Sequence, residues 1–201
     1  MQPQISIKLF GASGHAKVIM DIIEAQGDSV ACLYDDAPHC SELHGKVVHM
    51  ASESQVEGPL IISIGSNCDR KYIADKYTLD YAKAIHPQSI ISPSAVVGDG
   101  SMVMQGAIRQ SDTSIGRHCI INSGATIDHE CKIGDFVHIL PHATLCGNVQ
   151  VGEESWIGAG ATIIPSIKIG KWSTIGAGAT VIRDVKDNSI VAGIPAKIIK
   201  K

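Results

Sequence analysis

The residue types best suited to chemistry in this sequence lie together in the stretch Asp128-His129-Glu130. A neutral imidazole is the natural general base near pH 7, and an adjacent carboxylate can fix its tautomer and support the positive charge that develops on it. Asp128 and Glu130 compete for the role of that carboxylate. His138 follows nine residues after His129 and can donate a hydrogen bond to a carbonyl, although a packed or exposed histidine fits this position equally well. We therefore expect proton transfer at His129, with a merely solvated histidine as the alternative.

Covalent catalysis has no matching motif in the chain. The stretch GASGH at 11–15 lacks the GxSxG pattern of a serine nucleophile, and none of the cysteines is marked as a nucleophile. Direct transfer between two bound reactants needs only a base and correct positioning. The residues therefore favour direct transfer without a covalent intermediate.

The candidate base lies inside a repeat of six residues that runs from Ile91 to Lys186 without an insertion. Ile, Val or Leu fills the first place in 15 of the 16 hexads, and the exception is Arg109. Positions six apart are rotated by about 600° along an α-helix, so their side chains would not line one face. The repeat instead predicts that each hexad is a short strand plus a corner and that three hexads form one triangular coil. First-place and fifth-place side chains should then point inward, where Arg109 would mark a bulge or pair with an acid across a subunit boundary.

The second to fourth places of each hexad are the corners in this interpretation, and the sixth place faces outward. Glycine is frequent at second and fourth places, where we expect a tight bend with positive φ. His129 falls in a third place and Glu130 in a fourth, so both side chains should leave the column at a corner. His118 falls in a fourth place, and we expect it to be exposed.

Metal binding is the rival chemistry, because histidine is a common zinc ligand and β-helix enzymes with histidine-bound zinc exist. His138 and His142 have HxxxH spacing, but one faces outward from a strand and the other lies at a corner. His129 and His142 lie at different corners. We therefore expect no metal site.

Residues 1–88 lack the six-residue repeat. We expect the fold class α/β plus β for the whole chain, with a small Rossmann-like parallel α/β domain at 1–88. A β-helix domain with a C-terminal tail should follow at 89–201. The expected elements are strands at 5–10, 29–34 and 59–65 and helices at 16–27 and 66–77. Ligands of parallel sheets bind at the carboxyl ends of the strands, where 11–15, Asp35-Asp36 and 65–67 should converge. The N–H groups at a helix start favour an anion, so a nucleoside diphosphate fits this edge. The alternative for GASGH is a turn that only connects the strand to the helix and binds no ligand.

The bulk properties exclude several classes of protein. The formal net charge is −3 with acids and bases intermixed, which leaves no footprint for nucleic acid or an anionic membrane. The start of the sequence lacks a signal-peptide pattern, and no apolar run approaches the roughly 18 residues needed to cross a bilayer. The six cysteines form no CxxC motif, which favours reduced thiols. We expect a cytoplasmic protein that acts on small molecules.

Several motifs resemble one family over almost the whole chain: GASGHAKVIMDII at the start, YDDA at 34–37, IGSNCDR at 64–70, INSGATIDHEC at 121–131, CGNV at 146–149 and AGIPAK at 192–197. The hexads resemble the left-handed parallel β-helix of the hexapeptide-repeat acyltransferases. The motifs are similar to the sugar O/N-acetyltransferase group, which includes sialic acid O-acetyltransferases and nucleotide-sugar N-acetyltransferases. The resemblance is greatest to the UDP-4-amino-sugar N-acetyltransferases of bacillosamine synthesis.

The resemblance implies acetyl-CoA as cosubstrate, no metal, and roles for the matched positions. The catalytic residues it implies are His129 as general base, Glu130 as its orienting acid, and Asn122 in the acetyl-transfer site; Asp128 stands where the bacillosamine enzymes have a glutamate. The implied coenzyme-binding residues are His138, Gly147, Ala159, Gly160 and Ala177. The implied nucleotide-sugar-binding residues are Gly11, Ser13, Gly14, His15, Asp35, Asp36, Gly65 and Asn67.

From the resemblance we expect a homotrimer with active sites between neighbouring β-helices. The expected reaction is direct acetyl transfer to the 4-amino group of a nucleotide-linked 4-amino-4,6-dideoxy sugar, with UDP as the first choice of nucleotide. His129 would act as the base, and His138 or backbone N–H groups would steady the oxyanion. The alternatives are O-acetylation of sialic acid or another sugar, N-acetylation of a GDP- or dTDP-linked amino sugar, and a β-helix that only binds or assembles.

Overall fold

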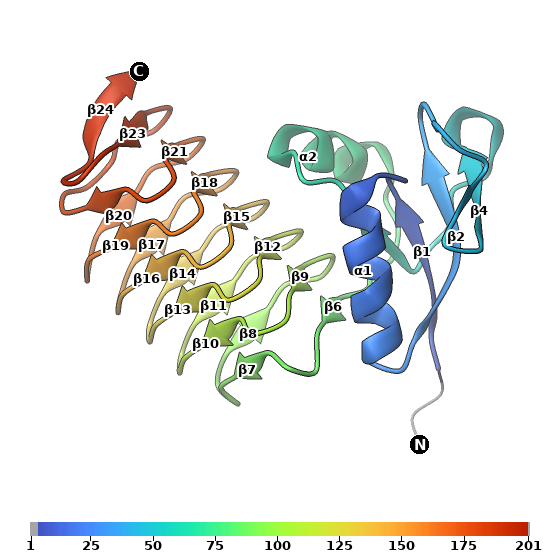
Figure 1. Ribbon diagram of the computed structural model, residues 1–201, viewed down its shortest axis with the longest axis horizontal. Helices are drawn as coiled ribbons and strands as arrows, with labels where there is room; N and C mark the ends of the chain where they lie inside the picture. The colour runs from blue at the N-terminus through green and yellow to red at the C-terminus, as the bar shows by residue number, and fades with distance from the viewer. Residues whose placement is uncertain (1–3, 201) are drawn as a thin grey trace.

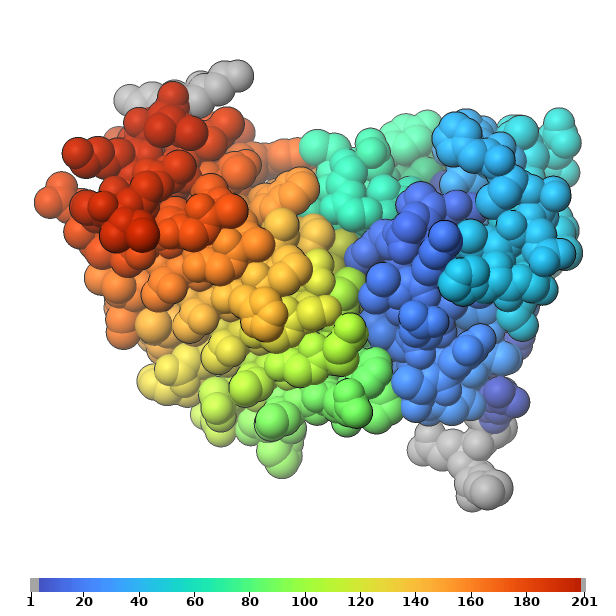
Figure 2. Space-filling model, viewed as in Figure 1, coloured from blue at the N-terminus to red at the C-terminus, as the bar shows by residue number. Residues whose placement is uncertain are grey.

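The computed structural model describes residues 4–200, without the side chain of Lys200, as a front α/β domain and a β-helix that lie side by side (Figure 1). The front domain occupies one end of the long axis, and the last coils of the β-helix occupy the other. The space-filling view shows the two parts in continuous contact (Figure 2). No helix among the described residues is long and apolar enough to cross a membrane.

The front domain contains a five-stranded sheet in the order β3-β4-β2-β1-β5. Its strands are β1 (Ser6–Phe10), β2 (Ser29–Asp35), β3 (Glu42–Leu43), β4 (Lys46–Met50) and β5 (Leu60–Ile62), and its helices are α1 (Gly14–Ala25), α2 (Asn67–Lys76) and the single 3-10 turn Ala51–Glu53. The strands are parallel except that β3 pairs antiparallel with β4. The three expected strands and two expected helices are confirmed. The β3-β4 hairpin was not foreseen, because only Leu43 and Val48 of these two strands are buried and the segment shows no apolar period.

Helix α1 lies between the sheet of the front domain and the β-helix (Figure 1). Its buried residues are spaced along one broad face and include Ile19, Met20 and Ile23, and the chain turns away at Gly27 with φ of +92°. Ile19 and Met20 belong to the same buried cluster as Met102 and Ile120, which point outward from the β-helix. The front domain is therefore fixed to the β-helix by an apolar core.

Short strands recur every six residues through the rest of the chain and form three parallel sheets. The β15 sheet contains β6 (Ala84–Ile85), β9 (Met102–Val103), β12 (Ile120–Ile121), β15 (His138–Ile139), β18 (Trp156–Ile157), β21 (Thr174–Ile175), β23 (Ile190–Ala192) and the antiparallel β24 (Lys197–Lys200). The β13 sheet contains β7 (Ile90–Ile91), β10 (Ile108–Arg109), β13 (Thr126–Ile127), β16 (Thr144–Leu145), β19 (Thr162–Ile163) and β22 (Thr180–Val181). The β14 sheet contains β8 (Val96–Val97), β11 (Ser114–Ile115), β14 (Lys132–Ile133), β17 (Gln150–Val151) and β20 (Lys168–Ile169).

The register confirms the coil of three hexads. Ile108 pairs with Thr126 and Thr126 pairs with Thr144, so successive coils are 18 residues apart. First-place side chains such as Ile127 and Ile139, together with fifth-place side chains such as Ala125, fill one buried cluster inside the column. The hexad pattern therefore predicted the coil, its three faces and its core.

The glycines at the corners need two different explanations. Fourth-place residues other than Ser94 and Asp184 have positive φ whether they are glycine or not: Gly124 has φ of +64° and Glu130 has φ of +60°. Second-place glycines lack positive φ, so our expectation was wrong for them. At Gly134 an added Cβ would lie 2.6 Å from the backbone nitrogen of Glu153 in the next coil. Where the second place holds glycine, as at Gly134, adjacent coils approach too closely for a side chain.

His118 does not lie in solvent, and the expected exposure was wrong. Its side chain is 2% exposed, because the front domain covers this corner of the β-helix. Phe136 stacks on the imidazole at 5.0 Å between ring centroids, and Tyr81 meets it edge-on at 4.4 Å. A corner is exposed in an isolated β-helix, but here the front domain packs on the corner and buries it.

Arg109 occupies the inward first place of β10 in a regular ladder with Ile91 and Ile127, so it marks no bulge. Its side chain is 1% exposed. None of its guanidinium nitrogens has a hydrogen-bond partner among the described residues. Burial lowers the pKa of Arg109 to about 10. The column thus contains a charged side chain at a position that the repeat reserves for an aliphatic one.

Candidate active site

The candidate base lies at the corner between β13 and β14, which we call the His129 edge of the β-helix. The Nδ1 atom of His129 lies 3.1 Å from Oε2 of Glu130. Asp128 instead accepts a 2.8 Å hydrogen bond from the backbone N–H of His129. Because a carboxylate only accepts, Nδ1 carries the proton and Nε2 keeps a free lone pair. The choice between the two acids that the sequence left open is thus resolved geometrically: Glu130 contacts the ring, and Asp128 fixes the corner backbone.

Gly147 lies one coil beyond His129 on the same edge. An added Cβ at this glycine would lie 2.6 Å from both Cε1 and Nε2 of His129. The absence of a side chain at Gly147 therefore makes room for the imidazole. His129 and Gly147, which the sequence placed in one site, are therefore in contact, and the ring of the candidate base lies against Gly147.

A second group of predicted residues lies where the β15 sheet faces the front domain. The corners that follow the strands of this sheet form the Asn122 edge, which also contains the predicted coenzyme residues Ala159, Gly160 and Ala177. Asn122 Nδ2 lies 3.1 Å from His138 Nε2, and His138 Nδ1 lies 3.3 Å from the carbonyl oxygen of Gly65. The outward position of His138 on its strand is confirmed, but the front domain buries its side chain.

The protonation state of His138 follows from its partners. Asn122 Oδ1 accepts a 2.8 Å hydrogen bond from the backbone N–H of Ser123, so its amide nitrogen must face His138. That nitrogen only donates, and therefore Nε2 of His138 accepts and Nδ1–H donates to Gly65. Burial, reinforced by the charge of Arg70, lowers the pKa of His138 to about 3. His138 is a neutral imidazole with both nitrogens occupied.

His15 lies in the first turn of α1, next to this group. Burial and then the charge of Arg70 lower its pKa to about 4, so it is neutral at physiological pH. Its Nε2 atom is buried and has no hydrogen-bond partner among residues 4–200. The neighbouring Ser13 and Gly14 are exposed, and no atom lies within 4 Å of an added Cβ at Gly14. The start of α1 therefore presents open backbone and one unpaired imidazole nitrogen.

The loops at the carboxyl ends of β1, β2 and β5 converge as expected. Asp35 accepts hydrogen bonds from the backbone N–H groups of Ala12 and Ala37, at 2.8 and 2.9 Å. Gly11 has φ of +105°, and an added Cβ would lie 2.7 Å from the side chain of Ile64. A hollow of about 300 Å³ beside Asp35 is also lined by Asp36 and Tyr72. Asp35 thus holds the loop after β1, while Asp36 borders open space.

The side-chain amide of Asn67 already forms hydrogen bonds with groups of the protein. Its amide nitrogen donates to the carbonyls of Glu154 and Ser155 at 3.0 and 3.2 Å, and its oxygen accepts from Arg70 at 2.9 Å. Asn67 therefore connects α2 to the corners between the β14 and β15 sheets, which we call the His118 edge. Its predicted contact with a sugar nucleotide stays a prediction.

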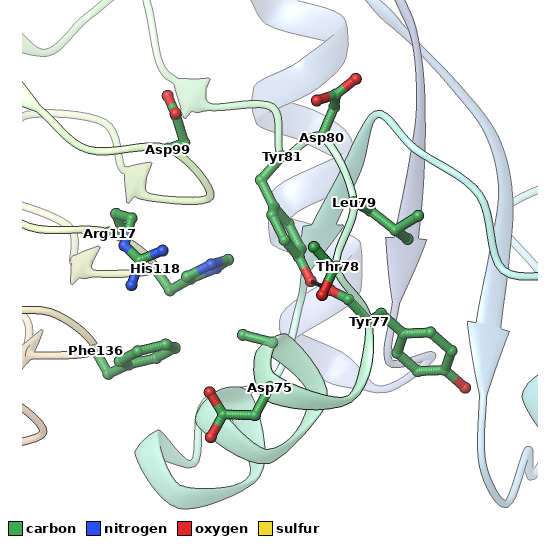
Figure 3. A pocket seen from close by; sticks show the side chains of 11 residues that line it. Asp75, Tyr77, Thr78, Leu79, Asp80, Tyr81, Asp99, Arg117, His118 and Phe136 are labelled. Carbon is green, nitrogen blue, oxygen red and sulfur yellow. Dashed lines mark hydrogen bonds between the residues drawn. The ribbon is translucent and has the colours of Figure 1, made fainter.

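A separate hollow of about 290 Å³ lies over the His118 edge (Figure 3). Figure 3 shows the parallel rings of His118 and Phe136 on one side and Tyr81 on the other. None of the site residues predicted from the sequence lines this hollow. It lies on a different edge of the β-helix from His129 and from Asn122.

The structure divides the predicted site residues into two half-sites. His129, Glu130 and Gly147 lie on the His129 edge. Asn122, His138 and the front-domain loops lie on or beside the Asn122 edge, and within residues 4–200 no hydrogen bond connects the two groups. One chain therefore carries both halves on different edges of the triangle.

Two residues near the site were missed from the sequence. Arg70 donates to five acceptors in both domains. Trp156 stacks on His138 at 5.4 Å between ring centroids, and 38% of its side chain remains exposed. Trp156 fills an outward sixth place, and an aromatic residue among Thr, Lys and Gln at such places was the available signal. Arg70 is the last residue of the motif IGSNCDR at 64–70, but we assigned it no role, because α2 is rich in charged residues that look solvent-exposed.

Within the described range, no three His, Cys, Asp or Glu side chains gather as a metal site. His129 and His142 lie on different edges, as expected.

Comparison with known proteins identifies the family. Residues 6–77 match the family model of the PglD N-terminal domain, and residues 112–147 and 148–183 match that of the bacterial transferase hexapeptide (six repeats). The chain is 41% identical over 111 residues to UDP-N-acetylbacillosamine N-acetyltransferase of Bacillus subtilis (strain 168). That match covers 49% of this chain and 51% of the relative, so the chain spans about half the length of the curated relative.

Two solved structures match over nearly the full length. One is a mutant of perosamine N-acetyltransferase from Caulobacter crescentus in complex with CoA and GDP-perosamine, with 35% identity, a TM-score of 0.90 and coverage of 98% of each chain. The other is the acetyltransferase domain of PglB from Neisseria gonorrhoeae FA1090 in complex with acetyl coenzyme A, with 33% identity and a TM-score of 0.88, covering 98% of this chain and 100% of that one. The chain belongs to the hexapeptide-repeat sugar acetyltransferases. Its fold is a Rossmann-like domain followed by the left-handed parallel β-helix of that family.

Proposed function

We propose that this protein transfers an acetyl group from acetyl-CoA to the 4-amino group of a nucleotide-linked 4-amino-4,6-dideoxy sugar, with UDP as the favoured nucleotide. The observation that carries the proposal is the corner at His129, where Glu130 fixes the proton on Nδ1 and leaves Nε2 free to accept another. Among the relatives, the Bacillus protein is named for a UDP-linked sugar, and the Caulobacter structure contains a GDP-linked one. The nucleotide is therefore the part of the proposal that experiment must decide.

The reaction balances without a covalent enzyme intermediate. The sugar amine attacks the thioester carbonyl, a carbon–nitrogen bond forms, and the carbon–sulfur bond breaks to release CoA. His129 Nε2 takes the proton that the amine loses and can return it to the departing thiolate. Glu130 supports the imidazolium that exists between these two transfers.

Asn122 is the better candidate for stabilising the oxyanion. We had expected His138 or backbone N–H groups, but both nitrogens of His138 already have protein partners. The amide nitrogen of Asn122 has two hydrogens, and His138 uses one of them. The second hydrogen is free to donate to the oxygen on which negative charge develops.

The acceptor would bind against the front domain. The open start of α1 suits the phosphates of a sugar nucleotide, because unpaired backbone N–H groups at a helix start attract anions. Trp156 borders His138 and offers an exposed ring face to an apolar face of the sugar. The predicted residues from Gly11 to Asp36 would then hold the nucleotide end.

The active site would form between subunits of a homotrimer. The His129 edge of one chain would face the Asn122 edge of a neighbour, and acetyl-CoA would lie along the groove between them, beside the predicted residues Gly147, Ala159, Gly160 and Ala177. This arrangement is supported by the location of the two half-sites on different edges of one chain. All six cysteines are free, which suits the cytoplasm as the place of reaction.

An acceptor panel tests this function. CoA release is measured with acetyl-CoA and UDP-, GDP- or dTDP-linked 4-amino-4,6-dideoxy sugars, with free sialic acid as the comparison. We expect the highest kcat/KM with the UDP-linked sugar and acetylation at nitrogen, read by mass spectrometry and NMR. A higher kcat/KM with free sialic acid would contradict the proposed N-acetylation and would indicate an O-acetyltransferase instead. If acetyl-CoA neither reacts nor shifts Tm, the proposed function is wrong, since a ligand at 100 Kd should stabilise the protein by about 2.7 kcal/mol.

A further inference from the structure

Arg70 is the most completely buried charged residue at the junction of the two domains. It lies on α2 with 0% of its surface exposed. Its five N–H groups have five acceptors: the carbonyls of Ile64, Gly65, His118 and Phe136 and the side-chain oxygen of Asn67, at distances of 2.8 to 3.1 Å. Every donor of the guanidinium is therefore satisfied, by atoms from both domains.

No carboxylate contacts this guanidinium in the described structure. Its partners are all neutral oxygens, so the positive charge remains unneutralised at the junction. Burial lowers the pKa of Arg70 to about 10, with Cys119 and Glu154 acting in the opposite direction, so the group is still charged at pH 7. A buried charge without an ion pair is costly, and a purely structural role could be filled by a neutral group.

The carbonyl of Gly65 connects Arg70 to the candidate active site. It accepts one hydrogen bond from Nη1 of Arg70 at 3.1 Å and another from Nδ1 of His138 at 3.3 Å. His138 in turn accepts from Asn122. The chain of contacts thus runs from Arg70 through Gly65 and His138 to the amide that we assign to the oxyanion.

We propose that Arg70 is a positioning residue for acetyl transfer: it holds the Gly65 carbonyl where His138 must donate from Nδ1, and so directs the free N–H of Asn122 toward the acetyl group. This inference rests on the proposed function. It assigns Arg70 no contact with substrate. Its action passes through the tautomer and orientation of His138.

The charges around His138 support the same role. From α1 it faces His15, from α2 it faces Arg70, from the loop before α2 it faces the Gly65 carbonyl, and from the β-helix it faces the uncharged groups of Asn122 and Trp156. Loss of the Arg70 charge removes a cause that lowers the pKa of His138. A protonated His138 has no acceptor to offer Asn122, and the amide would lose its anchor.

The test compares Arg70→Lys and Arg70→Met with Arg117→Met. Arg117 lies on the same His118 edge, but it is exposed and pairs with Asp135, so it serves as the matched control. The first readout is the ¹⁵N NMR spectrum of histidine-labelled protein, in which the His138 signals are identified by their loss in His138→Gln. The second is kcat and KM for acetyl-CoA as a function of pH.

In the wild type we expect an Nδ1–H tautomer at His138 down to about pH 4. Arg70→Lys keeps the charge but cannot span the five acceptors, so it should leave His138 neutral and lower kcat by up to about 100-fold with little change in KM. Arg70→Met should in addition raise the pKa of His138 above its wild-type value, while burial still holds it below the ordinary value of a histidine, so kcat should begin to fall at a higher pH on the acidic side than in the wild type. Arg117→Met should resemble the wild type in both readouts.

The wild-type spectrum alone can overturn the proposal. If His138 carries its proton on Nε2, Arg70 cannot act through it, whether or not the variants fold. Arg70→Lys or Arg70→Met with unchanged kcat and an unchanged His138 signal would also contradict it. Absence of acetyl transfer by the wild type would instead refute the proposed function, and the tautomer would still be measured.

Discussion

The imidazole of His129 lies directly against the Cα atom of Gly147, so that an added Cβ would come within 2.6 Å of Nε2. The atom proposed to accept the proton is thus the atom that a methyl group would displace. Gly147→Ala should lower kcat by about 10² or more, because the base would move away from the amine. The measurement is steady-state kinetics alongside Tm.

Gly45→Ala serves as the control for this substitution. Gly45 lies in the β3-β4 hairpin, and no atom lies within 4 Å of its added Cβ, although its φ is +75°. It should lower Tm through backbone strain and leave kcat unchanged. Full activity of Gly147→Ala would show that the imidazole can shift without loss.

The two acids at the His129 corner should differ in effect. Glu130→Gln removes the carboxylate that holds Nδ1, whereas Asp128→Asn keeps an oxygen that can accept from the backbone N–H. We expect Glu130→Gln to lower kcat more than Asp128→Asn, and His129→Ala to lower it by about 10² to 10⁴. The side chains of His129 and Glu130 are 56% and 64% exposed, so Tm should change little. Equal kinetic effects of the two acid substitutions would remove the special role of Glu130.

The proposed active site between two subunits predicts complementation between inactive chains. His129→Ala disables one half-site and Asn122→Ala the other, and each variant alone should be inactive. Co-expressed as mixed oligomers, they should recover a fraction of wild-type activity, because some interfaces contain two intact halves. Two variants that carry the same substitution provide the control. No recovery from proven mixed oligomers would place the site within a single chain.

Three histidines, of which His118 and His138 are buried and His15 is half-buried, make the fold sensitive to acid. Burial is the largest cause that lowers the pKa of His15 and His118 to about 4 and that of His138 to about 3. An unfolded chain binds these protons near pH 6.5, so between that value and about pH 4 the unfolded state holds more of them. The free energy of unfolding should therefore be largest above pH 6.5 and decrease as the pH falls through this window.

His118→Phe isolates one of these contributions. Phenylalanine keeps the ring between Phe136 and Tyr81 and removes the titrating group. The decrease of Tm from pH 7 to pH 4.5 should be smaller in this variant than in the wild type. His39→Phe, at an exposed position, should retain the wild-type slope. An identical slope in His118→Phe would mean that His118 is protonated in the folded state.

Arg109→Ile should stabilise the protein. It restores the aliphatic first place and removes a guanidinium without a partner among the described residues. Replacing buried charge by packed apolar groups is often stabilising by about 1–4 kcal/mol, so Tm should rise in thermal denaturation. Arg117→Ile, at an exposed ion pair, should change stability by less than about 1 kcal/mol. A lower Tm for Arg109→Ile would indicate an acid supplied by another subunit.

The fold was predictable because the same pattern of inward and outward positions recurs in every hexad. An aliphatic residue at every sixth position indicates a triangular coil with these side chains in its interior. Ile127 and Ile139 do point inward, as the spacing predicted. The His129 corner was predictable for the same reason, since a His-Glu pair has no packing role at a vertex. The pairing of Glu130 with the ring, and of Asp128 with the backbone, needed coordinates.

What escaped prediction depends on how the two domains meet. His118 is buried and Asn67 is occupied because Tyr81 and α2 of the front domain cover one edge of the β-helix. Arg70 sits in a polar helix whose sequence gives no sign that one of its charges is enclosed. Contacts between elements of unrelated pattern leave no period in the sequence, so these residues could be found only in three dimensions.

The front domain covers the His118 edge and leaves the His129 and Asn122 edges available to other chains. Contacts between these two edges join unlike surfaces, and such head-to-tail contacts close into rings rather than two-fold pairs. Every chain in a closed ring would lend its base to one neighbour and its amide to the other. The number of complete sites would equal the number of chains, and an open or broken ring would always lack one.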